Sequence, residues 1–350
     1  MTAIAPPHLA PHTGIATGLQ SLLNCTAFAP LEQTGWIEVT GSDRVRWLNG
    51  MTTNSIQQLQ SGEGNYNFLL SAQGRIQGDA YAFAQPDHLL LETDRSRLRA
   101  LVELLDRFII MDDVELKDLT ADRHGILVAG PTAAATLAGL GIEAPSTTDL
   151  RLSKIQWQQA EITLIHAHSP LVPRFELWSD PATAEALRDA LASVATLATE
   201  ADLEHLRLLE GTPRYGTDIR DRELPQETEQ TRALHFAKGC YLGQEIVERI
   251  RSRGQVHRLF HAFTLSGDLP TPGTALESNG KSVGEITSAA RIELPTGPIQ
   301  LALGYIRREA LSPASSPTSG PTPASAAPLD YPGGQAQPVP TPFRAAAETR

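Results

Sequence analysis

The octapeptide Lys-Gly-Cys-Tyr-Leu-Gly-Gln-Glu, at residues 238–245, is the stretch of the sequence with the clearest capacity for chemistry. A nearby ammonium and a nearby helix N-terminus both stabilise a thiolate, which is the reactive form of cysteine. Lys238 lies two residues before Cys240, and in an extended segment both side chains point to the same face. Apolar residues recur at helical spacing after Gly243, which predicts a helix that begins close to the thiol. Cys240 and Lys238 are therefore candidate catalytic residues. The alternative for Cys240 is a small buried hydrophobe beside a tight turn.

A basic run follows this octapeptide, in a chain whose formal net charge is -11. Such a local patch can hold a polyanion such as phosphate, polyglutamate or RNA. It can equally be a solvated helix face that pairs with the nearby Glu245 and Glu248. The residues of the run are Arg249, Arg251, Arg253, His257 and Arg258.

Two further places carry groups that suit a flat heteroaromatic ligand. Glu210 ends a predicted helix and could pair with an N–C–N edge, while Arg214 and Tyr215 follow it in a loop and could contact a ring. A helix end followed by a turn is the alternative interpretation of this segment. Asp79 is a carboxylate inside a predicted strand, and it requires a functional explanation only if it is buried.

Composition limits the classes of function. With 41% hydrophobic and 20% charged residues, the 350-residue chain is ordinary for a globular protein that buries a sizeable core. Its length predicts two or three domains or one large composite body. The negative charge disfavours stand-alone DNA binding and anionic membranes. No apolar run approaches the ~20 residues that span a bilayer, and no secretory signal is present. Having only two cysteines, Cys25 and Cys240, suggests a reducing, cytoplasmic location.

No known metal or nucleotide motif occurs in the sequence. His166 and His168 lie two residues apart on a predicted strand without a third ligand nearby, so no metal site is expected. Phosphate-binding loops with the usual glycine and lysine spacing are missing, as is the nucleophile elbow of serine hydrolases.

Hydrophobic periodicity predicts an α+β protein, because strands and helices do not alternate regularly. A strand–turn–strand hairpin at 66–83 carries Asp79, and Asp94 caps an amphipathic helix to 108. Further helices are expected at 43–51, 132–140, 181–191 and 199–210. Short strands between 259 and 306, separated by proline and glycine turns, predict a small β lobe or barrel. Residues 1–17 are interpreted as a flexible tail, and 311–350, rich in proline and alanine, as disordered.

The octapeptide resembles the K-G-C-Y-x-G-Q-E signature of the YgfZ family of folate-binding proteins. Five other stretches resemble parts of that family in the same order: the strand–helix unit at 39–54, the hairpin at 74–79, the segment at 210–216, the loop at 224–227, and the basic continuation formed by Arg249 with 253–254. The resemblance covers roughly residues 29–308. Residues 115–200 carry no motif that matches.

The YgfZ family is similar in fold to the aminomethyltransferase, or T-protein, of the glycine cleavage system. The resemblance therefore implies a three-lobed body with a central cavity that binds tetrahydrofolate or another reduced folate. It implies a folate-binding lobe at 29–115 plus 205–255, a second α+β lobe at 116–204 and a small β-barrel lobe at 256–310. Flexible or disordered tails are expected at 1–28 and 311–350.

The same resemblance assigns roles to the candidate residues. Glu210 is expected at the pterin edge, Arg249 and Arg253 at the anionic glutamate end, and Cys240 facing the folate cavity. Asp79 joins Cys240 and Lys238 as a candidate catalytic residue. The remaining candidates for folate binding are Arg214, Tyr215, Tyr241, Gln244 and Glu245.

The function implied is that of a tetrahydrofolate-binding accessory protein, which supports assembly or repair of iron–sulfur enzymes, including tRNA-modifying ones. Its partners would be iron–sulfur enzymes or assembly proteins, with an indirect link to tRNA modification. Because a cluster normally needs about four thiolates, one plausible cysteine cannot hold a cluster alone.

Two other functions remain open. One is a folate-dependent aminomethyltransferase of the T-protein type, with Asp79 as the acid–base or electrostatic group. Against it, the hairpin reads Gly78-Asp79 where the aminomethyltransferases carry an acidic pair. The other is a docking protein that binds RNA or an RNA-modifying enzyme through residues 249–258.

Overall fold

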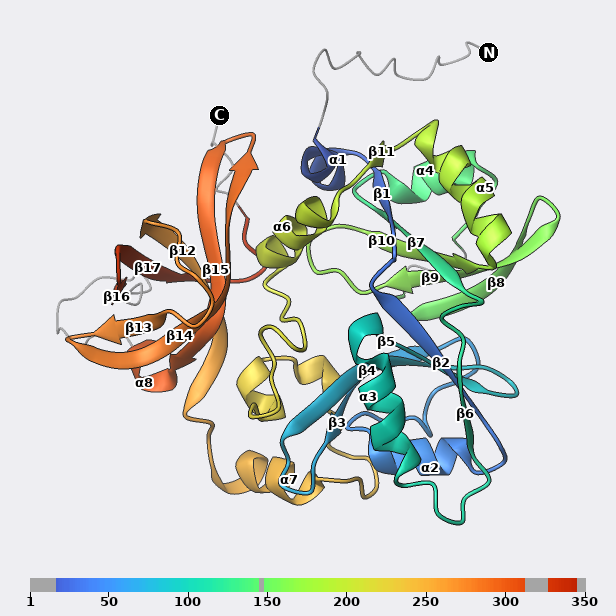
Figure 1. Cartoon of the computed structure of the whole chain (residues 1–350), viewed down its shortest axis with the longest axis horizontal. Helices are drawn as coiled ribbons and strands as arrows, with labels where there is room; N and C mark the ends of the chain where they lie inside the picture. The colour runs from blue at the N-terminus through green and yellow to red at the C-terminus, as the bar shows by residue number, and fades with distance from the viewer. Residues whose placement is uncertain (1–16, 145–147, 312–326, 345–350) are drawn as a thin grey trace, which may run out of the picture.

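The structure is a computed structural model that describes residues 17–144, 148–311 and 327–344. Three bodies lie side by side in Figure 1: two open sheets with their helices, stacked one above the other, and a β-barrel beside them. The helix α6 (Glu200–Glu210) lies between the barrel and the upper sheet. This arrangement confirms the predicted α+β class and the three-lobed body with its small barrel.

The lower sheet has the strand order β3-β4-β5-β2-β6. Its strands are β2 (Thr34–Thr40), β3 (Gly64–Leu70), β4 (Ile76–Ala84), β5 (Leu89–Asp94) and β6 (Glu115–Asp118). The helices α2 (Arg44–Met51) and α3 (Arg95–Asp106) belong to this lobe. Asp94 caps α3 by accepting a hydrogen bond from the Ser96 N–H at 2.8 Å, as predicted from its place before the apolar periodicity.

The upper sheet has six strands in the order β11-β1-β7-β10-β9-β8. They are β1 (Ala27–Pro30), β7 (His124–Ala129), β8 (Arg151–Trp157), β9 (Ala160–Ala167), β10 (Arg174–Ser179) and β11 (Thr196–Leu197). The helices α4 (Ala133–Gly139) and α5 (Pro181–Ala192) belong to this lobe. Thr199 and Asp202 form a capping box at the start of α6, which confirms that predicted helix.

The prediction of a flexible tail at 1–28 is wrong for its second half. The helix α1 (Gly18–Asn24) is followed directly by β1, and Leu19 and Leu22 of the helix are buried. Asp202 of α6 accepts a hydrogen bond from the Leu19 N–H at 2.9 Å. A contact 183 residues away along the chain therefore orders this segment, and local composition does not reveal it. Residues 1–16 lie outside the described part of the chain.

The third lobe is a closed barrel in the order β12-β15-β14-β13-β16-β17. Its strands are β12 (Arg258–Gly267), β13 (Ala275–Ser278), β14 (Lys281–Leu294), β15 (Gly297–Arg307), β16 (Leu329–Tyr331) and β17 (Gly334–Val339), and a short helix α8 (Arg308–Leu311) follows β15. The predicted disorder of 311–350 is therefore wrong for the last two strands. Register pairing of β17 with β12, from Ala262↔Val339 to Gly267↔Gly334, closes the barrel and removes its open edge. Residues 312–326 and 345–350 lie outside the described residues.

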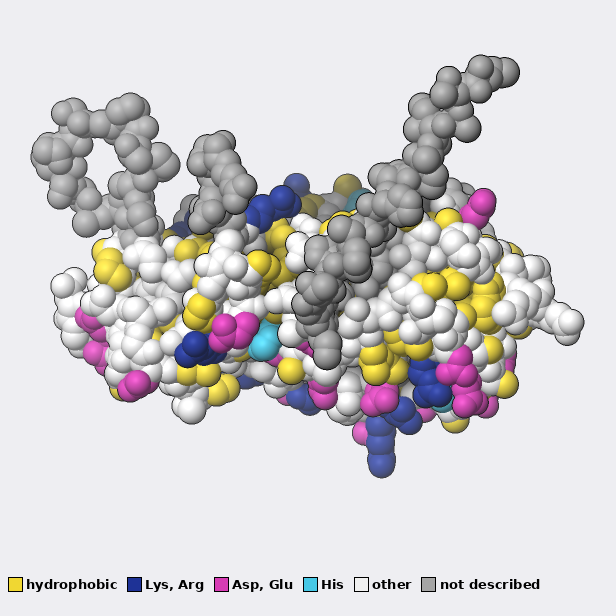
Figure 2. Space-filling view, turned by 90° about the horizontal axis from the view of Figure 1, so that it is seen from above, with side chains coloured by type: hydrophobic (Ala, Val, Ile, Leu, Met, Phe, Trp, Pro, Cys, Tyr) yellow, Lys and Arg dark blue, Asp and Glu magenta, His cyan; other side chains and the backbone are white. Residues whose placement is uncertain are grey.

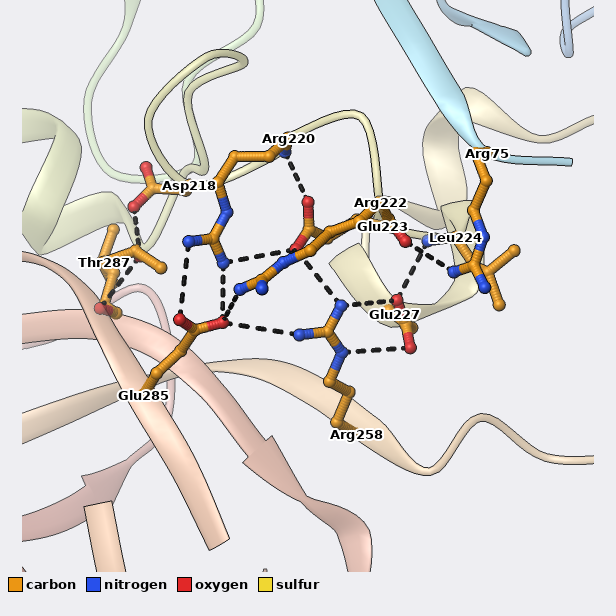
Figure 3. A network of polar contacts seen from close by, with 11 residues as sticks. Arg75, Asp218, Arg220, Arg222, Glu223, Leu224, Glu227, Arg258, Glu285 and Thr287 are labelled. Atoms are coloured by element: carbon orange, nitrogen blue, oxygen red, sulfur yellow. Dashed lines mark hydrogen bonds and ion pairs between the residues drawn. The ribbon is translucent and has the colours of Figure 1, made fainter. Parts of the chain in front are cut away.

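The long segment after α6 returns from the barrel side to the lower sheet. It contains two short 3₁₀ turns, η1 (Pro225–Thr228) and η2 (Thr231–Ala233), and the helix α7 (Gln244–Arg253). A cluster of arginines and glutamates ties this segment to the barrel (Figure 3). Glu285 of β14 binds Arg220 at 2.7 Å and also contacts Arg222 and Arg258. Glu223, which is fully buried, contacts the same three arginines.

On the face seen in Figure 2, basic and acidic side chains lie close together at several points. Within the described residues, no helix is long and apolar enough to cross a membrane.

Candidate functional site

A cavity of about 310 Å³ lies where the two sheets and the segment after α6 meet. Its walls come from β3, β4 and β5 of the lower sheet, β9 and β10 of the upper sheet, α6 and the loop that follows α6. Aromatic and apolar side chains line much of it, and ionisable groups point in from several elements. The polar lining residues include Tyr66, Asp79, Tyr81, Glu92, Arg174, Glu176, Glu210, Arg214, Tyr215 and Arg232.

Asp79, on the inner side of the hairpin, lies half-buried against the cavity. The Tyr66 hydroxyl donates a hydrogen bond to its Oδ2 at 2.6 Å. Burial raises the pKa of the Asp79 carboxyl to about 6, although the bond from Tyr66 favours the charged form. The group is therefore mostly ionised near pH 7 but exchanges a proton close to that pH. The prediction placed Asp79 in this hairpin, and the structure adds the burial that makes it a candidate for acid–base or electrostatic work.

The positive charge of Arg232, from the turn η2, acts on this carboxylate and favours its ionised form. Its guanidinium lies 4.3 Å from the Tyr66 ring centroid, and its Nη2 donates to the Tyr81 hydroxyl at 3.1 Å. Its Nη1 is buried and has no hydrogen-bond partner among the described residues. A ligand in the cavity can accept from this donor, which the sequence interpretation missed.

Glu210 is the last residue of α6, and only 8% of it is exposed. Gly211 ends the helix with a φ of 69°, a left-handed conformation that favours glycine. The Ser169 hydroxyl donates to Oε1 of Glu210, and burial raises the pKa of the Glu210 carboxyl. One oxygen is thus held by the protein while the side chain lines the cavity. This geometry leaves the carboxylate able to receive N–H groups from a ring edge.

A second pair of carboxyl groups lies in the cavity wall, where the two sheets meet. Glu176 of β10 binds Arg174 at 2.8 Å and accepts from the Trp178 indole N–H at 3.1 Å. Burial and the charge of Glu176 hold the pKa of Glu92 well above its usual range, so Glu92 keeps its proton to a higher pH than a free carboxyl does. The sequence interpretation missed both glutamates. Their signal was a single acidic residue inside each apolar run, at 89–92 and 175–178.

The octapeptide is split between two environments. The Lys238 ammonium is buried and donates to the carbonyls of Asn49, Thr52 and Asn54 at 2.7, 2.6 and 2.6 Å, at the C-terminal end of α2. Burial lowers the pKa of Lys238 to about 7, while the three carbonyls and the negative end of the helix dipole favour its charged form. Lys238 therefore acts as the cap of α2. The expected pairing of Lys238 with Cys240 on one face is not what the structure shows.

The Cys240 side chain is exposed and free, and it does not line the central cavity. The expectation that it faces the folate cavity is thus wrong. The predicted helix does begin nearby, at Gln244 after the N-cap Gly243. Because the backbone turns outward between the buried Lys238 and the buried Tyr241, the thiol faces solvent.

The other candidates divide between the cavity and the surface. Arg214 and Tyr215 line the cavity with Asp79 and Glu210. Tyr241 is buried in an apolar cluster, and its N–H donates to the Gln244 side chain at 3.2 Å. None of the candidates from 238 to 253 lines the cavity.

The charged candidates on α7 face solvent, whereas Gln244 is half-buried at its start. Glu245 and Arg249 form an exposed ion pair at 2.6 Å, and Arg253 is exposed at the end of the helix. Arg251 lies within 3.5 Å of Glu248. These pairs fit the interpretation of the basic run as a solvated helix face, and Arg258 is instead part of the arginine–glutamate cluster of Figure 3.

Among the described residues, no group of three or more histidine, cysteine or acidic side chains is placed to hold a metal ion.

Comparison with known proteins gives a consistent result. The family described as the GCVT N-terminal domain matches residues 15–238. The "Putative transferase At1g60990, chloroplastic" of Arabidopsis thaliana is 26% identical over 305 residues, covering 86% of this chain and 70% of the relative. The "tRNA-modifying protein YgfZ" of Yersinia enterocolitica is 27% identical over 282 residues, covering 78% of this chain and 83% of the relative. The crystal structure of the glycine cleavage system aminomethyltransferase T from Bartonella henselae superposes with a TM-score of 0.78 at 19% identity, covering 93% of this chain and 88% of that one.

Proposed function

The chain belongs to the family of the GCVT N-terminal domain, and from this premise we propose that it binds tetrahydrofolate or a closely related reduced folate in the central cavity. The observation that carries the proposal is the convergence of Glu210, Asp79 and Arg232 on one cavity. A reduced pterin offers adjacent N–H donors along one edge and a flat ring. Glu210 supplies the matching acceptor, and the tyrosines of β3 and β4 supply aromatic walls.

In this proposal, the folate-loaded protein supports the assembly or repair of iron–sulfur enzymes, including tRNA-modifying ones. The relatives named as tRNA-modifying proteins support a role connected with tRNA. The exposed thiol of Cys240 supports contact with a partner, because it is accessible from outside. Since a cluster normally needs about four thiolates, this single thiol would share a ligand with a partner rather than hold a cluster.

A titration of the protein with tetrahydrofolate under anaerobic conditions tests the ligand. We expect saturable binding to the wild-type chain, and binding weakened about tenfold or more in Glu210→Gln, because a charged acceptor is lost in a buried site. Arg99→Gln is the matched control, since Arg99 is exposed on α3 and does not line the cavity. Equal affinity of Glu210→Gln and the wild type would remove Glu210 from the proposed site.

Complementation of a deletion strain tests the accessory role. The wild-type gene is expected to restore the activity of an iron–sulfur tRNA-modifying enzyme, and Cys240→Ser is expected not to restore it. Full rescue by Cys240→Ser would show that the accessory function does not need the thiol. The proposal that the protein binds folate would not be affected by that result.

A second candidate function is folate-dependent aminomethyl transfer, and the Asp79 carboxyl in the cavity wall favours it. With a pKa of about 6, its carboxylate can stabilise a developing positive charge or take a proton from an attacking amine near neutral pH. Release of methylene-tetrahydrofolate from an aminomethyl donor is the assay. Turnover that is lost in Asp79→Asn supports this candidate, and turnover that Asp79→Asn leaves unchanged excludes the proposed role of the carboxylate.

A further inference from the structure

A second hollow, of about 750 Å³, lies between the start of α3 in the lower lobe and α5 in the upper lobe. Its walls also include the connection between β1 and β2 and the turn between β6 and β7. We call it the α3–α5 cleft. It shares Leu31, Gln33 and Thr34 with the central cavity, so one stretch of chain forms a wall of both.

Four basic residues line the α3–α5 cleft and come from three different elements. Arg95 begins α3, Arg123 lies in the turn before β7, His124 begins that strand, and Arg188 lies on α5. The two acidic residues of the lining, Glu32 and Glu185, are exposed. Only a long contact of 3.7 Å joins Glu185 to Arg188. The lining therefore carries an excess of positive charge in a chain that is acidic overall.

Arg123 is the most unusual of these cations. Its guanidinium lies 5.8 Å from the Trp178 ring centroid, and its Nη1 is buried without a hydrogen-bond partner among the described residues. Burial lowers its pKa, and the charge of Glu38 opposes that effect only in part. A guanidinium with unmet donors away from water is costly, so the site gains from an acceptor that the rest of the described chain does not provide.

An indole lies beside it in the same wall. The Nε1 of Trp36 is also buried without a partner in the described part of the chain. The Trp36 and Trp178 rings meet edge to face at 5.6 Å, so Trp178 is in contact with both Trp36 and the Arg123 guanidinium. Two unmet donors of different chemical types thus lie in one wall of one cleft.

We propose that the α3–α5 cleft is a binding site for a small anionic molecule, whose carboxylate or phosphate oxygens accept from Arg123 and are neutralised by Arg95 and Arg188. A guanidinium matches such a group with two parallel hydrogen bonds. The volume lies in the range of small-molecule sites.

The same oxygens can come from two sources. One is a free phosphate or carboxylate metabolite. The other is the γ-glutamyl tail of a folate whose ring occupies the central cavity. This second source rests on the proposed function. The shared wall of the two hollows makes the second source worth a separate arm in the experiment.

Tryptophan fluorescence reports directly on this cleft, because Trp36 lines it and Trp178 contacts Arg123. The full chain is titrated with inorganic phosphate, with citrate, and with monoglutamyl and pentaglutamyl tetrahydrofolate. We expect saturable binding of at least one probe. In Arg123→Gln and in Arg188→Gln that binding is expected to weaken about tenfold or more, because one charged contact is lost. Arg188→Gln is included because the Arg188 side chain is half exposed, so this variant is expected to fold even if Arg123→Gln does not.

Arg99→Gln is again the control, because it removes an exposed cation from α3 outside the cleft. Phosphate or citrate binding that both cleft variants weaken assigns the cleft to a free anion. A preference for pentaglutamyl folate that disappears in Arg123→Gln, with monoglutamyl binding unchanged, assigns it to the folate tail. Failure of every probe to saturate, or binding that neither variant weakens, overturns the proposal. Folate binding through Glu210 is measured by the monoglutamyl arm alone, so the two proposals can fail separately.

Discussion

The environment of Lys238 leads to a sharp prediction: Lys238→Met destabilises the fold, whereas Cys240→Ser, two residues away, does not. The Lys238 ammonium makes three hydrogen bonds of 2.6 to 2.7 Å to backbone carbonyls at the end of α2. Methionine has a similar length but no donor. The substitution therefore leaves carbonyl groups without a partner in a largely buried place.

The magnitude follows from two opposing contributions. Each buried carbonyl that loses its partner costs about 1–3 kcal/mol. Burial lowers the pKa of the Lys238 ammonium to about 7, which means that its charged form is destabilised by loss of water. Removing the ammonium removes this desolvation penalty and so offsets part of the cost of the unpaired carbonyls. Three carbonyls together cost about 3–9 kcal/mol and the removed desolvation returns about 4–5 kcal/mol, so the free energy of unfolding is expected to fall by about 1–4 kcal/mol. Cys240 is exposed, so Cys240→Ser is expected to change the free energy by less than about 0.5 kcal/mol.

Urea unfolding followed by far-ultraviolet circular dichroism measures both variants beside the wild type. A clearly lower midpoint for Lys238→Met, with Cys240→Ser unchanged, is the expected result. The reasoning is refuted if Lys238→Met unfolds at the wild-type midpoint. Such a result, combined with loss of complementation, would return Lys238 to a chemical role beside the thiol.

Three further predictions concern other parts of the molecule. Asp79→Asn is expected to stabilise the protein at pH 7 by up to about 3 kcal/mol. The folded-state pKa of the Asp79 carboxyl is raised to about 6, so the wild-type protein loses stability as the pH rises through that value, and the variant does not. The urea midpoints of the two proteins should therefore converge towards pH 4. Truncation after Leu311 removes β16 and β17 and should lower the melting temperature, whereas a disordered tail would leave calorimetry unchanged. Glu285→Gln should cost about 1–3 kcal/mol in urea unfolding, and less at high salt, because its three arginines lose a shared partner.

The sequence predicted most accurately those helices whose ends are fixed by interactions between residues close together in the chain. The cap at Asp94 and the capping box of Thr199 and Asp202 are complete within a few residues, so the helices behind them were found with nearly correct bounds. Asp79 and Glu210 were found because each belongs to a recognisable segment. Their shared cavity depends on how the two sheets and α6 pack together. The family resemblance implied such a cavity, whereas the spacing of residues in the sequence did not.

Residues whose role depends on distant partners were missed or misjudged. The carbonyls that hold Lys238 are 184 to 189 residues away in the chain, so its neighbour Cys240 was the only visible partner. Glu92 and Glu176 interact only because the fold brings β5 and β10 together, so their role cannot be read from the sequence around either residue. The strands β16 and β17 are short and lie in a stretch rich in proline and alanine, and pairing with β12 and β13 is what orders them.

A crystal structure of the protein with bound tetrahydrofolate tests the central claim most directly. The account predicts the pterin in the central cavity, with its N–H edge within about 2.7–3.2 Å of the Glu210 carboxylate and the ring between Glu210 and Asp79. A pterin bound instead at the outer surface, beside α7 and Cys240, with the central cavity free of the ligand, would contradict it.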